Sequence, residues 1–155
     1  MLSFSEYICG TKSGKIMKKI AVVFLLGILS LACKKEISEQ ELTKLNGYWE
    51  IEKAEMPDGT KKEYTINTTI DFFKVDNKKG FRKKVMPQLD GKYLMNDLAE
   101  NIQLENKDGN VIVHYTTPYA KWKEEILELS DDKMVVKNEQ DITYYYKRAT
   151  KFELK

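Results

Sequence analysis

Residues 101–117 read NIQLENKDGNVIVHYTT and decide the fold class of this 155-residue chain. Apolar side chains recur at every second position on both sides of Asp108-Gly109, which is the spacing of strands that bury one face. An Asp-Gly pair between two such runs is a typical turn of a β-hairpin. The second run is also rich in the β-branched and aromatic residues that pack well on a pleated sheet. The stretch therefore predicts two antiparallel strands, 101–106 and 110–117.

The same alternation of apolar runs and turn residues continues in both directions from this hairpin. The strands that it predicts cover residues 48–56, 62–75, 81–86, 92–95, 101–106, 110–117, 120–129, 133–138 and 141–148. Short strands spaced by about ten residues indicate an all-β sandwich or barrel. Because closure removes the exposed edges of a meander, we expect a small antiparallel up-and-down β-barrel of about eight or nine strands. Periodicity alone leaves a two-sheet sandwich open.

A short helix is expected before the first strand. The residues Ser38-Glu39-Gln40-Glu41 have the S-x-x-E pattern of a capping box, in which two side chains satisfy backbone N–H groups at the start of a helix. Leu42 and Leu45 are three positions apart, so they share one helix face. Gly47 can end the helix in a left-handed conformation. The pattern predicts a two-turn helix over 38–46 with one apolar edge.

The N-terminal part of the chain has the features of a secretory signal. From Met17 it reads MKKIAVVFLLGILSLAC, in which two lysines precede an apolar run of about a dozen residues. A helix of that length rises about 18 Å, short of the roughly 30 Å hydrocarbon core of a bilayer, so we do not expect a transmembrane anchor. The small Ala32 stands before Cys33, where a signal peptidase needs a small side chain.

The stretch Leu29-Ser30-Leu31-Ala32-Cys33 resembles the lipobox of bacterial lipoproteins, with Ser30 where Leu is more usual. The resemblance implies that the Cys33 thiol is diacylated, that the chain is cleaved before it, and that the new amine is acylated. Acyl chains such as palmitate would then anchor the protein, since each buried methylene adds about 0.8 kcal/mol of membrane affinity. An ordinary signal peptide followed by a chance or structural Cys is the alternative.

These features divide the chain into five segments. They are 1–16, a segment that precedes the expected translation start at Met17 or forms a disordered extension; 17–32, the lipoprotein signal peptide; 33–37, the lipidated tether; 38–150, the folded domain; and 151–155, a C-terminal tail. The expected location is the bacterial cell envelope, lipid-anchored at the outer membrane on its periplasmic or surface face. The chain has two Cys, and with Cys9 removed and Cys33 acylated we expect no disulfide.

Charge gives little indication of a partner. The whole chain carries a formal net charge of +2, which gives no electrostatic case for nucleic acid. We interpret the basic stretch Arg82-Lys83-Lys84 as part of a solvated hairpin, because Asp71, Asp76 and Asp90 are close in sequence. We expect a monomer.

Gly47-Tyr48-Trp49 opens the first predicted strand, and Arg148 ends the last one. This arrangement resembles the G-x-W signature of lipocalins, and the layout over 45–150 resembles the small lipocalin-like lipoproteins of flavobacteria. In that family the Trp lies at the closed end of the barrel and an Arg near the last strand packs over its ring. The resemblance implies that Gly47, Trp49 and Arg148 form a structural lock at the barrel floor. It also implies that the protein binds or carries a small hydrophobic ligand.

Aromatic residues within the predicted strands are the candidates for lining a ligand site, because small apolar ligands bind in aromatic-lined cavities with a few polar groups. They are Tyr64, Phe72, Phe81, Tyr93, Tyr115, Trp122, Tyr144 and Tyr146. The alternative is that these rings simply fill the core. In that case the protein would be a non-enzymatic interaction or structural module of the envelope.

The residues give little support for catalysis, and we expect neither an enzyme nor a cofactor. Ser38 is a predicted helix cap, Ser130 lies in a polar turn, and His114 is the only His, so we expect no Ser/His/Asp site. One His without a free Cys cannot form a zinc cluster, so no metal site is expected. Glu124 and Glu125 are adjacent on a strand and therefore point to opposite faces.

Overall fold

The computed structural model describes residues 37–95 and 97–150. The segment 1–16, the signal peptide 17–32, Cys33 with the rest of the tether up to residue 36, and the tail 151–155 lie outside the described residues, so those predictions stay predictions. Within the described ranges no helix is long and apolar enough to cross a membrane.

The described residues form one short 3-10 helix and ten strands. The helix is η1 (Glu41–Leu45), and the strands are β1 (Gly47–Glu55), β2 (Lys61–Glu63), β3 (Ile70–Asp76), β4 (Lys79–Pro87), β5 (Tyr93–Met95), β6 (Glu100–Lys107), β7 (Asn110–Thr116), β8 (Lys121–Leu129), β9 (Lys133–Asn138) and β10 (Thr143–Arg148).

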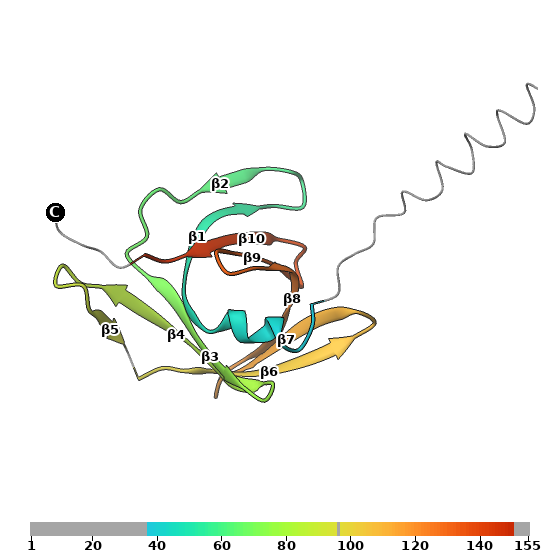
Figure 1. Ribbon diagram of the computed structural model, residues 1–155. Helices are drawn as coiled ribbons and strands as arrows, with labels where there is room; N and C mark the ends of the chain where they lie inside the picture. The colour runs from blue at the N-terminus through green and yellow to red at the C-terminus, as the bar shows by residue number, and fades with distance from the viewer. Residues whose placement is uncertain (1–36, 96, 151–155) are drawn as a thin grey trace, which may run out of the picture. The chain divides into compact units, whose positions relative to one another are not determined.

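Eight strands close into a barrel in the order β1-β3-β4-β6-β7-β8-β9-β10, because β10 pairs back onto β1 (Figure 1). All of these pairings are antiparallel. The remaining two strands are additions, with β2 paired to β1 and β5 paired to β4. The predicted all-β antiparallel barrel is confirmed, and the sandwich that periodicity left open is excluded.

The predicted strand over 62–75 is wrong in extent, because the structure divides it into β2 and β3. The residues between them, 64–69, leave the sheet although several are β-branched. The Asn67 side chain anchors this excursion by donating hydrogen bonds to the Ile51 carbonyl at 2.8 Å and to the Glu50 carboxylate at 2.9 Å. Ile51 lies beside an irregularity in the β1–β10 register, where ladder pairing is interrupted.

The predicted capping box is present, but the helix is shorter and tighter than predicted. The Glu41 carboxylate accepts a hydrogen bond from the Ser38 backbone N–H at 3.0 Å, and the Ser38 hydroxyl accepts one from the Glu41 N–H at 3.3 Å. The helix is a 3-10 helix rather than two α-helical turns, because its end is held by the barrel. The Asn46 side chain bonds the backbone of Val75 on β3, and Asn46 itself is already extended.

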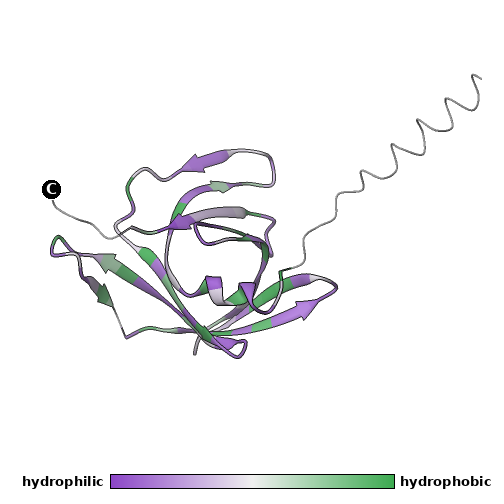
Figure 2. Ribbon diagram, in the orientation of Figure 1, coloured by the Kyte–Doolittle hydropathy of each residue, from purple (hydrophilic) through white to green (hydrophobic). Residues whose placement is uncertain are grey.

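The apolar core occupies the part of the barrel that surrounds η1. Leu42 and Leu45 of the helix are buried together with Trp49, Phe73 and other inward-facing side chains. Along the strands, hydrophobic and hydrophilic stretches alternate, as Figure 2 shows. The half of the barrel next to the β3–β4 hairpin, where η1 lies, has an apolar interior. We call this half the closed end.

Candidate functional site

The closed end is fastened by a contact between the first and last strands. The Arg148 guanidinium lies over the indole of Trp49, 3.7 Å from the ring centroid, and Trp49 is fully buried. Trp49 and Arg148 are direct partners in the β1–β10 register. The indole N–H donates to the Leu45 carbonyl at 2.8 Å, which ties η1 to the same point.

Arg148 also replaces the hydrogen bonds that the short helix cannot make for itself. Its two terminal nitrogens donate to the carbonyls of Lys44 and Asn46, and its Nε donates to the carbonyl of Asp131, each at 2.8 Å. Burial lowers the pKa of Arg148, which the nearby charges of Asp131 and Asp132 oppose. The structure therefore brings Gly47, Trp49 and Arg148 together around the end of η1.

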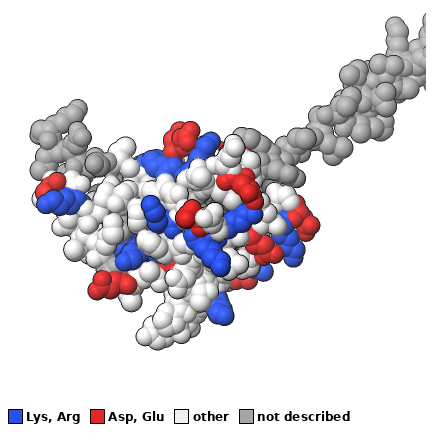
Figure 3. Space-filling model, turned by 60° about the horizontal axis from the view of Figure 1, so that its bottom comes forward, with Lys and Arg blue, Asp and Glu red and all other residues white. Residues whose placement is uncertain are grey.

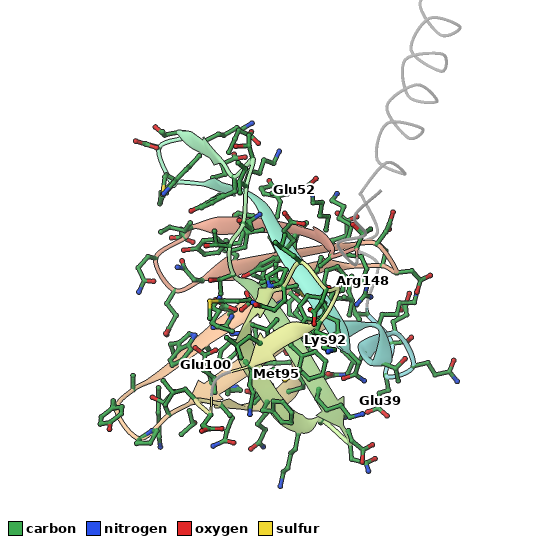
Figure 4. All side chains as sticks on the ribbon, turned by 90° about the vertical axis from the view of Figure 1, so that its left-hand side faces the viewer. Glu39, Glu52, Lys92, Met95, Glu100 and Arg148 are labelled. Atoms are coloured by element: carbon green, nitrogen blue, oxygen red, sulfur yellow. The ribbon has the colours of Figure 1, made fainter. Side chains whose placement is uncertain are left out.

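The other half of the barrel contains charged residues that face inward. We call Asp71, Arg82, Lys84, Glu100 and Glu124 the inner charged cluster. Three of its members, Asp71, Arg82 and Glu124, are buried. The strand alternation explains their orientation, because Asp71 lies two residues before the core residue Phe73 and Glu124 lies two residues before Ile126. Figure 4 shows Glu100 and Arg148 toward opposite ends of the barrel.

Arg82 is the centre of this cluster. Its guanidinium lies 4.3 Å from the Tyr115 ring centroid, with Phe73 and Trp122 at 5.9 and 6.0 Å. Its Nε donates a hydrogen bond to the Glu100 carboxylate, and its Nη1 lies 3.6 Å from Oε2 of Glu124. The paired carboxylates and the aromatic face compensate for the loss of hydration around this buried cation.

Two carboxylate oxygens in the cluster are buried and lie beside a cation, but accept no well-oriented hydrogen bond from the described residues. They are Oδ1 of Asp71 and Oε2 of Glu124. Lys84 reaches to within 2.5 Å of the Asp71 oxygen, but this ion pair lacks hydrogen-bond geometry, and the Lys84 side chain remains 44% exposed. Buried polar atoms in proteins are normally hydrogen-bonded, so these two oxygens, each beside a cation, can still accept a well-oriented hydrogen bond.

The protonation states in the cluster follow from burial. Burial raises the pKa of Glu124, and the charge of Arg82 and a hydrogen bond from Tyr115 oppose that rise. Burial also raises the pKa of Tyr115 and of Tyr146 well above the ordinary value, so both phenols are neutral. For Arg82, burial lowers the pKa, but Tyr115, Asp71 and Glu124 more than compensate, and the guanidinium stays charged.

Four of the aromatic residues predicted to line a ligand site lie on the inner face. Tyr115 and Trp122 are cross-strand partners whose rings stack at 5.1 Å and 8°. Tyr146 is buried in the core, and Tyr144 packs against it half-buried. Tyr64 is half-buried beyond β2, with Nζ of Lys62 5.0 Å from its ring centroid.

Three others, Phe72, Phe81 and Tyr93, lie on the outer face, so these candidates do not line the barrel interior. Phe72 precedes the core residue Phe73 and therefore points outward. It contacts Tyr48 at 4.7 Å and Phe81 at 6.1 Å, and Tyr93 stacks on Tyr48 at 4.1 Å. The reason is strand parity: a residue count gives alternation but does not by itself say which set faces inward.

The charged residues of the inner cluster were missed as site residues by the sequence reasoning. Arg82 was interpreted as part of a solvated hairpin, yet it is 7% exposed. The signal that could have found it and its partners is a polar residue at a strand position whose i±2 neighbours are core residues, as Glu124 stands between Trp122 and Ile126. His114 lies on the outer face, where it hydrogen-bonds Glu105 at 2.7 Å.

On the face shown in Figure 3, acidic and basic side chains are intermingled. Among residues 37–95 and 97–150, no group of three or more His, Cys, Asp or Glu is placed to hold a metal ion. The inner charged cluster is therefore the feature of the described chain that most needs a functional explanation.

Comparison with known proteins agrees with this architecture. Residues 45–136 match the family model described as the lipocalin-like domain. The chain belongs to this lipocalin-like family. The match covers the strands from β1 to most of β9, and it includes Trp49 and every member of the inner charged cluster.

Two solved structures are similar to this lipocalin-like chain. One is a lipocalin-like protein from Bacteroides uniformis, with 12% sequence identity, a TM-score of 0.45, and coverage of 68% of this chain and 99% of that chain. The other is an uncharacterized protein from Bacteroides eggerthii, with 14% identity, the same TM-score and the same coverage. No curated protein matches the sequence.

Proposed function

We propose that this lipocalin-like protein binds a small, largely hydrophobic molecule inside its barrel and is anchored in the bacterial cell envelope through Cys33. A lipocalin-like fold suggests small-molecule binding in a barrel. The observation that carries the proposal is the contrast between the two halves of the interior. The closed end is apolar, whereas the other half combines stacked aromatic rings with the inner charged cluster.

The contrast supports a binding role because buried charges are a poor way to stabilise a core. Taking a charged pair out of water costs several kcal/mol per ion, and well-packed apolar residues of similar size are often as stable or more so. The closed end shows that this chain can fill its barrel with apolar side chains. Features that break a local packing rule are expected at functional sites.

Anchoring rests on the N-terminal sequence, since Cys33 lies outside the described residues. The positive residues, apolar run, small residue and Cys follow one another in the order of a lipoprotein signal. In cells fed labelled palmitate, the wild-type protein should take up label and fractionate with membranes, and Cys33→Ser should do neither. Undiminished labelling of Cys33→Ser contradicts the assignment.

Ligand binding is tested on protein isolated from the organism that makes it. Native mass spectrometry should show the chain with an additional mass that organic extraction releases as a small molecule. Protein overproduced in an unrelated host should regain that mass when it is incubated with the extract. Absence of any retained molecule from both preparations contradicts the proposal.

A second candidate is a non-enzymatic interaction module, and one observation favours it. Several large apolar side chains are exposed in loops, in β5 and near the end of β4: Ile66, Met86, Leu89, Leu94, Met95 and Leu98. Exposed apolar groups of this kind are common at contact surfaces with other proteins. Recovery of one stoichiometric envelope protein together with an empty barrel would favour this candidate over ligand binding.

A further inference from the structure

The inner charged cluster has more acid than base. It contains three carboxylates, Asp71, Glu100 and Glu124, against the two cations Arg82 and Lys84. Glu100 is hydrogen-bonded to Arg82, whereas Oδ1 of Asp71 and Oε2 of Glu124 are ion-paired to Lys84 and Arg82 without a well-oriented hydrogen bond. The Asp71 side chain is 1% exposed and the Glu124 side chain 10% exposed, so bulk water does not readily supply the missing donors.

The group that already occupies this region is an ammonium. Nζ of Lys84 lies 2.5 Å from Oδ1 of Asp71, but nearly half of the Lys84 side chain is exposed. A long flexible side chain in that position can move its ammonium into solvent when another cation takes its place, because the buried carboxylate then keeps a partner. Arg82 cannot move away in this manner, since its guanidinium is held by Glu100 and by the Tyr115 ring.

From these observations we propose that the bound molecule carries a protonated amine, which replaces Lys84 at Asp71, donates a hydrogen bond to Oε2 of Glu124 and places its apolar part against Trp122. This inference rests on the proposed function and specifies its ligand class. Carboxylates and aromatic faces both attract cations, and both are present. A ligand with an anionic head is disfavoured, because Arg82 already faces two carboxylates.

The test uses three soluble probes that differ in the polar group: 2-phenylethylamine, 2-phenylethanol and 3-phenylpropanoate. Their binding to the full chain is measured by isothermal titration calorimetry at neutral pH. We expect the amine to bind at least about tenfold more tightly than the alcohol and the propanoate to bind most weakly, a tenfold ratio being about 1.4 kcal/mol. Equal binding of amine and alcohol overturns the inference but leaves the proposed function standing.

Matched variants locate the effect. Glu124→Gln and Asp71→Asn should each remove most of the amine preference, whereas Glu125→Gln, on the outer face of the same strand, should retain it. Lys84→Met should tighten amine binding by removing the competing ammonium, and Lys83→Met, its outward-facing neighbour, should not. Thermal melts verify that each variant is folded. A Lys84→Met variant that binds the amine no better than Lys83→Met contradicts the displacement step.

The two proposals fail in different ways. If the protein retains a native small molecule but binds no probe, or binds all three alike, the amine inference fails alone. If no native molecule is retained and no probe binds, both proposals fail.

Discussion

At the scale of single residues, the closed end depends on Gly47 in a way that few positions do. Gly47 has φ of +117°, which side chains rarely adopt, and a Cβ there would lie 3.0 Å from Nη1 of Arg148. The glycine therefore serves both the backbone and the guanidinium that covers Trp49. Because a side chain at position 47 would be strained and crowded, this position requires glycine, and the G-x-W pattern can be recognised in the sequence.

We predict that Gly47→Ala lowers the free energy of unfolding by about 2 kcal/mol, from backbone strain plus displacement of Arg148. The matched control is Gly59→Ala. Gly59 also has a positive φ, of +84°, but no atom lies within 4 Å of its Cβ position. Urea denaturation of both variants separates the two contributions, and equal losses would show that crowding of Arg148 does not matter.

Glu124 gives a residue-scale prediction on pH. Burial raises its pKa in the folded protein, whereas in the unfolded chain the value returns to about 4.5. Between the pKa of Glu124 in the unfolded chain and its higher pKa in the folded protein, the folded state binds more protons. The free energy of unfolding therefore falls as pH rises through that range. Gln does not titrate, so Glu124→Gln lacks this pH dependence. The free energy of unfolding of the wild type minus that of Glu124→Gln should therefore decrease from about pH 4 upward.

The measurement is the urea midpoint of wild type, Glu124→Gln and the outer-face control Glu125→Gln over this pH range. The groups that influence the pKa of Glu124, namely Arg82, Asp71, Lys84 and Tyr115, are unchanged in both variants. If wild type and Glu124→Gln keep a constant difference at every pH, burial does not raise the pKa of Glu124.

At the scale of elements, η1 shows why a helix boundary is hard to predict. The capping box is local, and the sequence specifies it through Ser38 and Glu41. The end of the helix is decided by distant partners instead. The Asn46 side chain pairs with the backbone of Val75 as a neighbouring strand would. Its amide group donates to the Val75 carbonyl at 3.0 Å, and its side-chain oxygen accepts from the Val75 N–H at 2.5 Å. Those contacts span 29 positions of sequence, so no local pattern encodes them.

We predict that Asn46→Ala destabilises the protein by about 2 kcal/mol, on the order of two hydrogen bonds at roughly 1 kcal/mol each. The exposed Asn106, near the end of β6, provides a control whose replacement by Ala should cost little. Equilibrium unfolding in urea measures both. A loss no larger than that of Asn106→Ala would mean that Asn46 does not tie η1 to β3.

The division of the predicted strand 62–75 has a similar cause at the element scale. Residues such as Tyr64 and Ile66 have high strand propensity, and their pattern favours one continuous strand. The Asn67 side chain instead bonds the backbone of β1, and the chain leaves the sheet before β3 begins. Strand propensity describes only the local preference of a residue. Whether a strand continues depends on the neighbouring strand with which it pairs.

At the scale of the whole molecule, alternation and turn chemistry were enough to predict an antiparallel meander of short strands. Closure into a barrel was favoured because it covers the edges of the sheet, but periodicity also left a two-sheet sandwich open. These patterns were not enough to predict what lies inside. Which residues face inward depends on register, and register is set jointly by all eight strands. Arg82, Asp71 and Glu124 are therefore visible as a cluster only when β3, β4 and β8 are placed around one barrel.

The central claim, that a ligand binds inside the barrel beside the inner charged cluster, can be tested by one nuclear magnetic resonance titration. The chain has two tryptophans, so its indole N–H groups give two resolved signals. Trp122 lies at the proposed site, and Trp49 is fully buried at the closed end with its N–H bonded to Leu45. We predict that 2-phenylethylamine shifts the Trp122 signal in a saturable way and leaves that of Trp49 in place. An unmoved Trp122 signal, with shifts confined to outer-face residues such as Tyr48, Phe72 and Tyr93, would contradict the account.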